Sequence, residues 1–424
     1  MVTKRINNYS LFKNRRKNFM ANVCQENPNV KNGVILLFAD FENDRNSFIQ
    51  ESSFFYLTGV NEPGAVLFLY LDGRGVLYIP SYAENRKKWV GVDIEANEQE
   101  AKKIGFDEIK FLGNESKGYF IQPIFDKTVY ATLLEDLEIF LKEQNSKVFL
   151  CSVSNFQKQA FSLLSSNLLN ENYAISDISK NIHELRRSKC KSEIECIKKA
   201  IRVTHDAFIN ASKKIVRGKV ECEIQAEIES VFTSKGCGVA FPTIVASGKN
   251  STILHYTLRN RKIKKGDLVV VDIGAQYQNY AADLTRTFPV GGKFSVRQKE
   301  IYNIVLGAQK YIANLAKPGM FLNNPSAGDQ SLNHLAKKYF ERLGYGESFS
   351  HGIGHFLGLD VHDVGDASQA LGEGCVITIE PGIYIEKENL GIRIEDNFLI
   401  TKNGCLCLSK KLPKEIDEIE KMMR

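Results

Sequence analysis

Four apolar segments in the second half of the chain each contain a carboxylate where a buried strand would carry an apolar side chain. Asp272 interrupts VVVDIG, Asp283 lies in YAADLT, Glu380 closes VITIE and Glu395 lies in IRIED. A carboxylate buried in a strand costs free energy unless it is paired or binds a cation. A single case would suggest an ion pair or a helix cap, whereas four in one region indicate a fold built around a metal site.

A histidine-rich segment lies among these carboxylates. Residues 350–363 read SHGIGHFLGLDVHD and hold three of the 7 histidines of the chain, namely His351, His355 and His362. Imidazoles bind metals, transfer protons or pack as ordinary side chains, and composition alone leaves these roles open. The glycines between them allow the backbone to pass close to a crowded site. Beside the carboxylates, the cluster favours a metal site.

The spacing of the carboxylates predicts how two of them meet. Asp272 and Asp283 lie on two strands of an expected hairpin whose turn falls near 277–279. They should therefore lie opposite or diagonal to each other across the ladder, with Cβ atoms roughly 5–8 Å apart. On the last strand, Arg393 and Glu395 are two residues apart and should face the same side.

The proposed ligands also indicate the kind of metal. Four carboxylates and one imidazole carry four negative charges, which would balance two divalent cations. Oxygen-rich sites suit manganese, magnesium or calcium, whereas a structural zinc site would be expected to use thiolates. With a histidine included, two manganese ions are the first choice, and cobalt, iron and zinc remain alternatives.

Length and periodicity predict two domains of mixed α/β (α+β) class. A chain of 424 residues is too long for one ordinary core. The boundary is placed between residues 178 and 179, after which a polar stretch leads to a long helix. The first domain (1–178) should contain strands at 33–40, 65–71, 75–80, 107–112 and 147–150, and helices near 94–104, 131–144 and 155–168.

The second domain (179–424) alternates helices and strands. A capping box formed by Ser192 and Glu195 should open a helix that runs to about Ile215. Further helices are expected at 222–235, 295–316 and 328–343, and strands at 267–275, 279–290, 376–385 and 390–401.

Composition disfavours membrane and nucleic-acid proteins. The longest apolar runs, such as 33–39 and 65–71, are far shorter than the roughly 20 residues of a membrane helix. The net charge of +6 is mild, and the basic stretch at 259–265 has no aromatic residues between its charges, so it is interpreted as a solvated loop. We expect neither a membrane nor a nucleic-acid partner.

The N-terminus and the cysteines bear on location. The basic N-terminal stretch has no apolar signal region, and an exposed amphipathic helix is a simpler interpretation than a transit peptide. The 9 cysteines are odd in number and lack CxxC spacing, which indicates a reducing, cytoplasmic compartment. The pair Cys405 and Cys407 should share one face of a strand.

Several motifs together resemble one family. They are ILHY (253–256), VVDIGAQYQNYAADLTRTF (270–288), HGIGHFLGLDVHD (351–363), ITIEPGIYI (377–385) and GIRIED (391–396). In this order they resemble the pita-bread metallopeptidases, in the branch of aminopeptidase P (Xaa-Pro aminopeptidase) and prolidase. FIQESSFFYLTGVNEPGAVL (48–67) resembles the N-terminal domain of the creatinase/aminopeptidase P type. The resemblance therefore covers nearly the whole chain.

The resemblance implies a role for each site residue. It makes five residues the ligands of a dinuclear centre: Asp272, Asp283, His355, Glu380 and Glu395. Of these, Asp283 and Glu395 would contact both metals, and Glu380 would also take the proton of a water bridging them. The resemblance assigns substrate binding and proton handling to His255, His351 and His362, and places Arg393 behind the ligands.

The implied function is release of the N-terminal residue from peptides with proline second. Prolidase, which cleaves Xaa-Pro dipeptides, shares every ligand and remains an alternative, as does a catalytically inactive pita-bread domain used for binding. Only a short link, 385–391, joins the last two strands of the site, which leaves the space beyond the proline open. The segment around Trp89 reaches a neighbouring active site in relatives, so we expect a homodimer or higher homo-oligomer.

Overall fold

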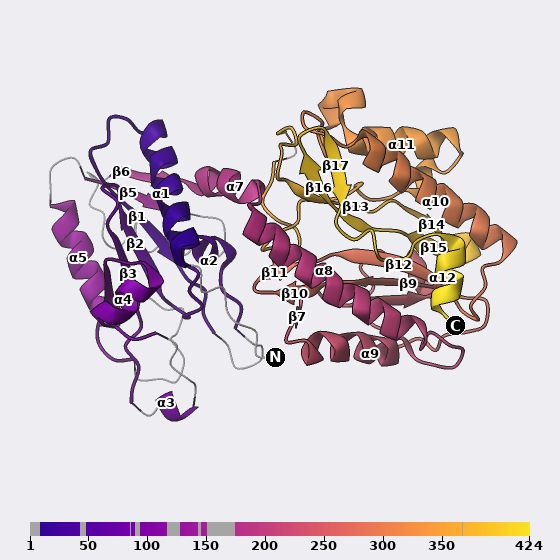
Figure 1. Cartoon of the computed structure of the whole chain (residues 1–424), viewed down its shortest axis with the longest axis horizontal. Helices are drawn as coiled ribbons and strands as arrows, with labels where there is room; N and C mark the ends of the chain where they lie inside the picture. The colour runs from indigo at the N-terminus through magenta and orange to yellow at the C-terminus, as the bar shows by residue number, and fades with distance from the viewer. Residues whose placement is uncertain are drawn as a thin grey trace. The chain divides into compact units, whose positions relative to one another are not determined.

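The computed structural model describes residues 9–42, 48–84, 86–89, 94–116, 128–142, 146–150, 174–366 and 368–424. The chain divides into two compact units between Leu185 and Arg186. This division falls inside helix α7 (Ser179–Arg187), which begins directly after the boundary placed from the sequence. Both units combine helices and strands, as the expected fold class requires (Figure 1).

The N-terminal unit is built on a six-stranded mixed sheet with the order β4-β3-β2-β1-β5-β6. Neighbours among β1, β2 and β3 are antiparallel, while β4, β5 and β6 are added in parallel. The strands are β1 (Asn32–Phe38), β2 (Val66–Tyr70), β3 (Gly75–Ile79), β4 (Glu108–Phe111), β5 (Ser146–Leu150) and β6 (Ala174–Asp177). Five of them were predicted, and the helix expected at 155–168 lies outside the described residues.

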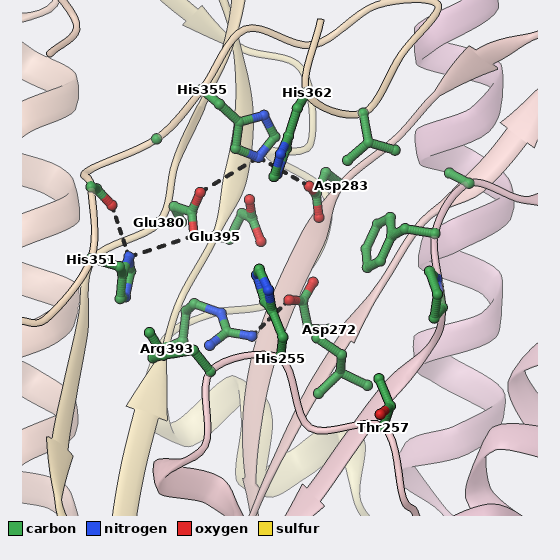
Figure 2. A pocket seen from close by; sticks show the side chains of 18 residues that line it. His255, Thr257, Asp272, Asp283, His351, His355, His362, Glu380, Arg393 and Glu395 are labelled. Atoms are coloured by element: carbon green, nitrogen blue, oxygen red, sulfur yellow. Dashed lines mark hydrogen bonds and ion pairs between the residues drawn. The ribbon is translucent and has the colours of Figure 1, made fainter. Parts of the chain in front are cut away.

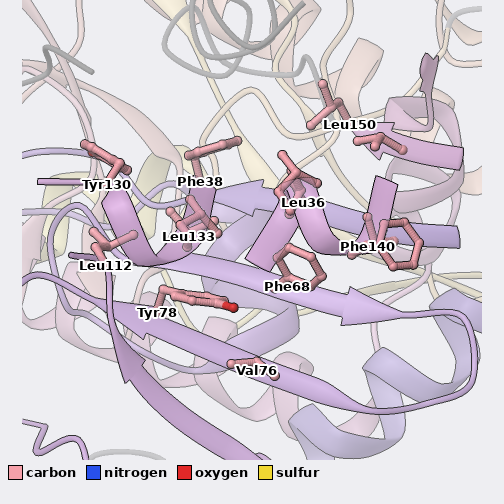
Figure 3. Packing of buried hydrophobic residues seen from close by; sticks show 14 of the residues in the cluster. Leu36, Phe38, Phe68, Val76, Tyr78, Leu112, Tyr130, Leu133, Phe140 and Leu150 are labelled. Atoms are coloured by element: carbon pink, nitrogen blue, oxygen red, sulfur yellow. The ribbon is translucent and has the colours of Figure 1, made fainter. Parts of the chain in front are cut away.

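The core of this unit lies between the sheet and helix α5 (Ala131–Leu141). Alternate residues of β1, such as Leu36 and Phe38, point to the same face and meet Leu133 and Phe140 of the helix (Figure 3). β1 is buried along almost its whole length, which explains its continuous apolar run. The remaining helices are α1 (Tyr9–Glu26), α2 (Ser52–Thr58), α3 (Arg86–Trp89) and α4 (Glu98–Ile104).

Helix α1 corrects the expectation of an exposed basic N-terminal helix, because two of its arginines are buried. Arg15 donates from Nη1 to the carbonyl of Tyr56 at 3.1 Å, and Arg16 donates from Nη1 to the carbonyl of Leu57 at 2.9 Å. Both carbonyls belong to the last turn of α2, where backbone oxygens lack helical partners and a cation is favourable. The basic residues therefore fix α1 to α2.

The C-terminal unit consists of helix pairs packed on short sheets. Helices α8 (Lys191–Ser212) and α9 (Glu221–Ser234) pack on strands of the first half, and α10 (Val296–Leu315) and α11 (Leu332–Arg342) accompany the second half (Figure 1). The strands of the first half are β7 (Gly238–Val239), β8 (Ile244–Ser247), β9 (Leu268–Ile273), β10 (Ala275–Tyr277), β11 (Tyr280–Ala281) and β12 (Leu284–Pro289). Those of the second half are β13 (Val376–Ile379), β14 (Gly382–Ile385), β15 (Leu390–Arg393), β16 (Asp396–Thr401) and β17 (Gly404–Cys407), followed by α12 (Ile416–Met422).

The start of α8 differs from the sequence prediction. The expected capping box of Ser192 and Glu195 is wrong, because the helix begins at Lys191 and Glu193 accepts the backbone N–H of Cys190 at 3.0 Å. Two pairs of residues have the capping-box spacing of three: Cys190 with Glu193, and Ser192 with Glu195. Packing decides between them, since Glu193 is buried and accepts the hydroxyl of Tyr280 at 3.0 Å.

Candidate metal centre

The first two carboxylates lie in β9 and directly before β12. Asp272 in β9 pairs with Thr285 in β12, so Asp283, two residues before Thr285, lies diagonal to Asp272, as predicted. The chain turns at Gln278 and Asn279, whose φ angles of 49° and 65° suit a tight hairpin turn. The spacing of the two carboxylates thus follows from a sharp turn and a regular register.

The other two carboxylates lie where the strands expected at 376–385 and 390–401 are each broken in two. Glu380 follows β13 before β14 begins, and Glu395 separates β15 from β16. At the second break, Glu395 bridges to Thr285, whose hydroxyl donates to Glu395 Oε2 at 2.7 Å. The breaks therefore aim Glu380 and Glu395 at the site of Asp272 and Asp283 (Figure 2).

His355 lies on a segment that runs beside β13. Its backbone N–H donates to the hydroxyl of Thr378 at 3.0 Å, and its carbonyl accepts the N–H of Thr378 at 2.9 Å. Only glycine fits at position 354, because a Cβ there would lie 2.1 Å from the Thr378 carbonyl oxygen. Nδ1 lies 3.0 Å from the carbonyl of Phe356 and must donate to it, which leaves Nε2 as a free lone pair.

The free Nε2 atom faces the carboxylates. It lies 3.3 Å from Asp283 Oδ2 and 3.5 Å from Glu380 Oε1. Ligand atoms of Asp283, His355 and Glu395 all lie within 4.8 Å of one another, a separation that one metal ion can span. Figure 2 shows these side chains converging from different strands and loops.

Three buried carboxylate oxygens of the site lack partners among the described residues. Asp272 Oδ1, Asp283 Oδ1 and Glu395 Oε1 are buried without a hydrogen-bond donor. Unpaired carboxylate oxygens in a buried site carry a large desolvation cost, which a divalent cation would remove. The donor set of carboxylates and one imidazole therefore fits hard or borderline divalent metals.

Burial and mutual repulsion raise the pKa of three of the carboxylates. Burial is the first cause for Asp283, whose pKa lies well above its usual value, followed by the charges of Asp272 and Glu380. The pKa of Glu395 is likewise well above its usual value, first because of burial and then because of the charge of Asp283. Burial also raises the pKa of Glu380. Without cations, the cluster would hold protons in their place.

Arg393 neutralises part of the negative charge. It donates from Nη2 to Asp272 Oδ2 at 2.6 Å, which agrees with its expected place behind the ligands. Its Nη1 donates to the hydroxyl of Tyr384 at 2.8 Å, and this hydroxyl lies 2.9 Å from Nε2 of His351. Burial raises the pKa of Tyr384 to about 12, so the phenol stays protonated and can donate to His351.

His351 has a protein partner at each ring nitrogen. Nδ1 lies 2.8 Å from the carbonyl of Gly352 and donates to it, which leaves Nε2 to accept from Tyr384. Burial, followed by the charge of Arg393, lowers the pKa of His351 to about 4. In this arrangement the imidazole is neutral, and its predicted part in proton transfer stays a prediction.

His362 is more exposed, and its ring lies 4.2 Å from that of His355, centroid to centroid. Burial lowers its pKa first, followed by the neighbouring His355 and His255. The next residue, Asp363, anchors this loop through ion pairs with Lys189 at 2.8 Å and Arg186 at 2.6 Å. The segment that precedes α8 therefore holds the loop of His362 in place.

A cavity of about 700 Å³ brings all the predicted site residues together. The residues of the sequence prediction that line it are Asp272, Asp283, His255, His351, His355, His362, Glu380, Arg393 and Glu395. The sequence did not identify the apolar wall, which includes Phe241, Pro242 and Leu254. It also did not identify Thr285 and Tyr384, although Thr285 shares a face with Asp283 and the period of a strand could have indicated it.

Such a site, with buried carboxylates and a histidine lining an open cavity, defines a metal-dependent enzyme. Residues 195–402 match metallopeptidase family M24, and residues 12–119 match the aminopeptidase P N-terminal domain. The Xaa-Pro aminopeptidase of Haemophilus influenzae is 33% identical over 427 residues, which cover 92% of this chain and 93% of that protein. The chain belongs to metallopeptidase family M24, in its pita-bread aminopeptidase P group.

Other relatives refine this placement. The Xaa-Pro dipeptidase of Pyrococcus horikoshii is 44% identical over 243 residues, which cover 56% of this chain and 66% of that protein. The structure of Escherichia coli aminopeptidase P with the inhibitor Pro-Leu has a TM-score of 0.80 at 29% identity and covers 98% of both chains. A zinc-substituted form of that enzyme with product has a TM-score of 0.79 at 28% identity, with the same coverage.

Proposed function

We propose that this protein is a metal-dependent Xaa-Pro aminopeptidase that releases the N-terminal residue from peptides with proline second. The observation that carries the proposal is the convergence of nine predicted site residues on one cavity, with three buried carboxylate oxygens that have no donor in the described structure. The full-length similarity to an Xaa-Pro aminopeptidase supports the substrate class.

The metal site would hold two divalent cations, with manganese as our first choice. Asp272, Asp283, His355, Glu380 and Glu395 would bind them. Bound divalent cations supply Lewis-acid polarisation of the scissile carbonyl and lower the pKa of water. The zinc-substituted relative indicates that a site of this family accepts more than one metal.

The side chains around the metals would transfer protons, bind substrate and orient a metal ligand. Glu380 has a raised pKa, and its side chain is 18% exposed, against 7% for Asp283. It is therefore suited to take a proton from the attacking water and return it to the leaving nitrogen. His362, with its lowered pKa, is neutral at pH 7 and can accept or donate a hydrogen bond to substrate. Arg393 keeps Asp272 oriented.

Substrate length is the point on which an aminopeptidase and a dipeptidase differ. The link between β14 and β15 is a single 3-10 turn, Glu386–Glu388, closed by Asn389 in a left-handed conformation with φ of 50°. We expect so short a link to leave the space beyond the proline open. The identity to the Xaa-Pro dipeptidase keeps the dipeptidase as a second candidate.

A comparison of three substrates tests the proposal. We expect Xaa-Pro-Yaa peptides to be cleaved faster than Xaa-Pro dipeptides, and Xaa-Ala-Yaa peptides far more slowly than both. The measurement is kcat/KM for each peptide with the metal-loaded protein. A preference for the dipeptide would identify a prolidase, and indifference to proline would refute both assignments.

Assembly and location are also part of the proposal. We expect at least a homodimer, with Trp89 near the substrate of a neighbouring subunit, although the Trp89 side chain lies outside the described residues. Light scattering measures this directly, and a fully active monomer would refute it. We place the protein in the cytoplasm because its 9 cysteines are odd in number and lack CxxC spacing. No described helix is both long and apolar enough to cross a membrane.

A further inference from the structure

Glu221, the first residue of helix α9, is a fully buried carboxylate away from the cavity. Its exposed fraction is 0%, and it is not among the residues that line the site. A carboxylate without contact to water is costly unless hydrogen bonds satisfy it. The groups that bind Glu221 therefore indicate what it does.

In the part of the chain that the structure describes, the donors to Glu221 come from one segment, residues 247–261. Oε1 accepts the backbone N–H and the hydroxyl of Ser247, both at 2.7 Å, and the amide of Asn250 at 3.1 Å. Oε2 accepts the hydroxyl of Tyr256 at 2.8 Å and the backbone N–H of Arg261 at 3.0 Å. One carboxylate thus joins the beginning, the middle and the end of this segment.

The same segment forms one wall of the site. It connects β8 to β9 and supplies Leu254, His255 and Thr257 to the cavity. His255 lines the same cavity as Asp272 and Arg393 (Figure 2). Because Tyr256 directly follows His255, its bond to Glu221 restrains the backbone that carries the imidazole.

The segment is also tied to the strand that carries Arg393. The hydroxyl of Ser251 accepts the backbone N–H of Gly391 in β15 at 2.8 Å. A Cβ at Gly391 would lie 1.9 Å from the Ser251 carbonyl oxygen, so the two backbones are in close contact. A shift of the segment would therefore disturb both His255 and β15.

We propose that Glu221 is a positioning residue that acts through the 247–261 segment and His255. The inference rests on the proposed function, since the family resemblance assigns His255 to substrate binding and His255 lines the cavity. A glutamine cannot replace this carboxylate, because its NH2 group would face a backbone N–H in either orientation: that of Ser247 or that of Arg261.

A double-mutant cycle on kcat/KM for an Xaa-Pro-Yaa peptide tests the inference. We expect Glu221→Gln to lower kcat/KM about tenfold at unchanged metal content, since a small misplacement of a substrate-contacting group is costly. In a His255→Ala background the same change should lower kcat/KM less than about twofold, because the group through which Glu221 acts is gone. An undiminished effect in that background would overturn the inference.

Glu223→Gln is the matched control. Glu223 lies on the same first turn, is 43% exposed, pairs with Lys219 at 2.6 Å and makes no contact with the segment among its described bonds. Its substitution should leave kcat/KM within about twofold. If Glu221→Gln does not fold, Tyr256→Phe, which removes only one hydroxyl of the network, goes through the same cycle with a smaller expected loss.

An NMR measurement separates this inference from the proposed activity. In protein labelled at histidine Cε1, the resonance of His255 is identified by its absence in His255→Ala. It should shift in Glu221→Gln and in Tyr256→Phe, and stay in place in Glu223→Gln. An unchanged resonance in the first two variants would overturn the positioning role, whereas failure of the wild type to cleave Xaa-Pro peptides would refute only the proposed function.

Discussion

At the scale of single residues, the site is a cluster of negative charge that the protein leaves incomplete. Asp283 and Glu395 are 5% and 1% exposed, and each has a buried oxygen without a donor in the described structure. The pKa of both groups is raised well above its usual value, first by burial and then by neighbouring carboxylates. The metal-free protein therefore has a destabilised site, and metal binding should contribute to folding stability.

The first prediction is that Asp283→Asn stabilises the metal-free protein while it weakens metal binding. A neutral amide removes one buried charge, so we expect a gain of roughly 1–3 kcal/mol in the free energy of unfolding. The pKa of Asp283 is higher in the folded than in the unfolded protein. The destabilisation by this group is therefore absent below the unfolded-state pKa and reaches its full size above the folded-state pKa. Urea unfolding with chelator should thus show a larger gain at pH 8 than at pH 5.

The matched measurement adds saturating Mn²⁺ to both proteins. The wild type should then become the more stable of the two, because only its full set of ligands binds the cations strongly. If Asp283→Asn destabilises the metal-free protein at pH 8, the account of a destabilised, cation-requiring cluster is wrong.

The histidines differ in what they can offer to a metal or a substrate. Nε2 of His355 faces two carboxylates, whereas His362 is an exposed neighbour on the following loop. Their spacing in the sequence could not separate these roles, because the tautomer of His355 depends on the carbonyl of Phe356. The hydrogen bond, which only the folded chain shows, determines which nitrogen is free.

The second prediction follows from this difference. His355→Ala should lower metal occupancy, while His362→Ala should leave it nearly intact and reduce kcat by roughly 100-fold, a common size for the loss of a proton-handling group. Metal analysis after gel filtration and kinetics at saturating Mn²⁺ measure the two effects. The opposite pattern of metal occupancy would exchange the two assignments.

At the scale of elements, the prediction of the strands was right in location and incomplete in continuity. The strands expected at 376–385 and 390–401 exist, but each is interrupted by its carboxylate, at Glu380 and at Glu395. The two-residue alternation of apolar side chains continues through both breaks, so this alternation alone cannot show where the strands are interrupted. The bridge from Glu395 to Thr285 of a distant strand sets the second break, and such tertiary pairing has no local signal.

The loop of His362 is held by a buried ion-pair network. Asp363 and Lys189 have side chains that are each 1% exposed, and Arg186 joins them. Burial opposes the charge of Asp363, but Lys189 and Arg186 outweigh it and hold the pKa of Asp363 below its usual value. The sequence places these residues far apart, which explains why the network was not predicted.

The third prediction concerns this network. Asp363→Asn removes the carboxylate that pairs with the buried Lys189 and one of the two that pair with the buried Arg186, whose other ion pair is with Asp360. It should cost about 3–5 kcal/mol in the free energy of unfolding at pH 7. The pKa of Asp363 is lower in the folded than in the unfolded protein. The stability that its charge contributes is therefore present above the usual aspartate pKa and is lost as the pH falls through the lower, folded-state pKa. The difference between variant and wild type should thus shrink below about pH 4.

Chemical denaturation at pH 7 and pH 3 measures this difference, with Asp366→Asn as a control at an exposed aspartate three residues further along the chain. A constant difference at both pH values would show that Asp363 acts through packing and not through its charge.

At the scale of the whole molecule, the resemblance to the pita-bread metallopeptidases predicted the type of both domains, whereas length and composition predicted only that there are two. The fold of the N-terminal unit follows from apolar runs such as 33–38, but its mixed strand order depends on long-range pairing. Family similarity spans both units, since separate matches cover 12–119 and 195–402. The cluster itself needed no family, because four carboxylates in apolar strands already indicated a metal site.

The central claim is that the cluster forms a two-metal peptidase site. The most direct measurement strips the protein with a chelator and titrates it with Mn²⁺ while it cleaves an Xaa-Pro-Yaa peptide, with bound metal determined at each point. Activity should be absent in the stripped protein and should saturate when about two ions are bound per chain. Full activity in the metal-free protein, or saturation with no metal bound, would contradict the account.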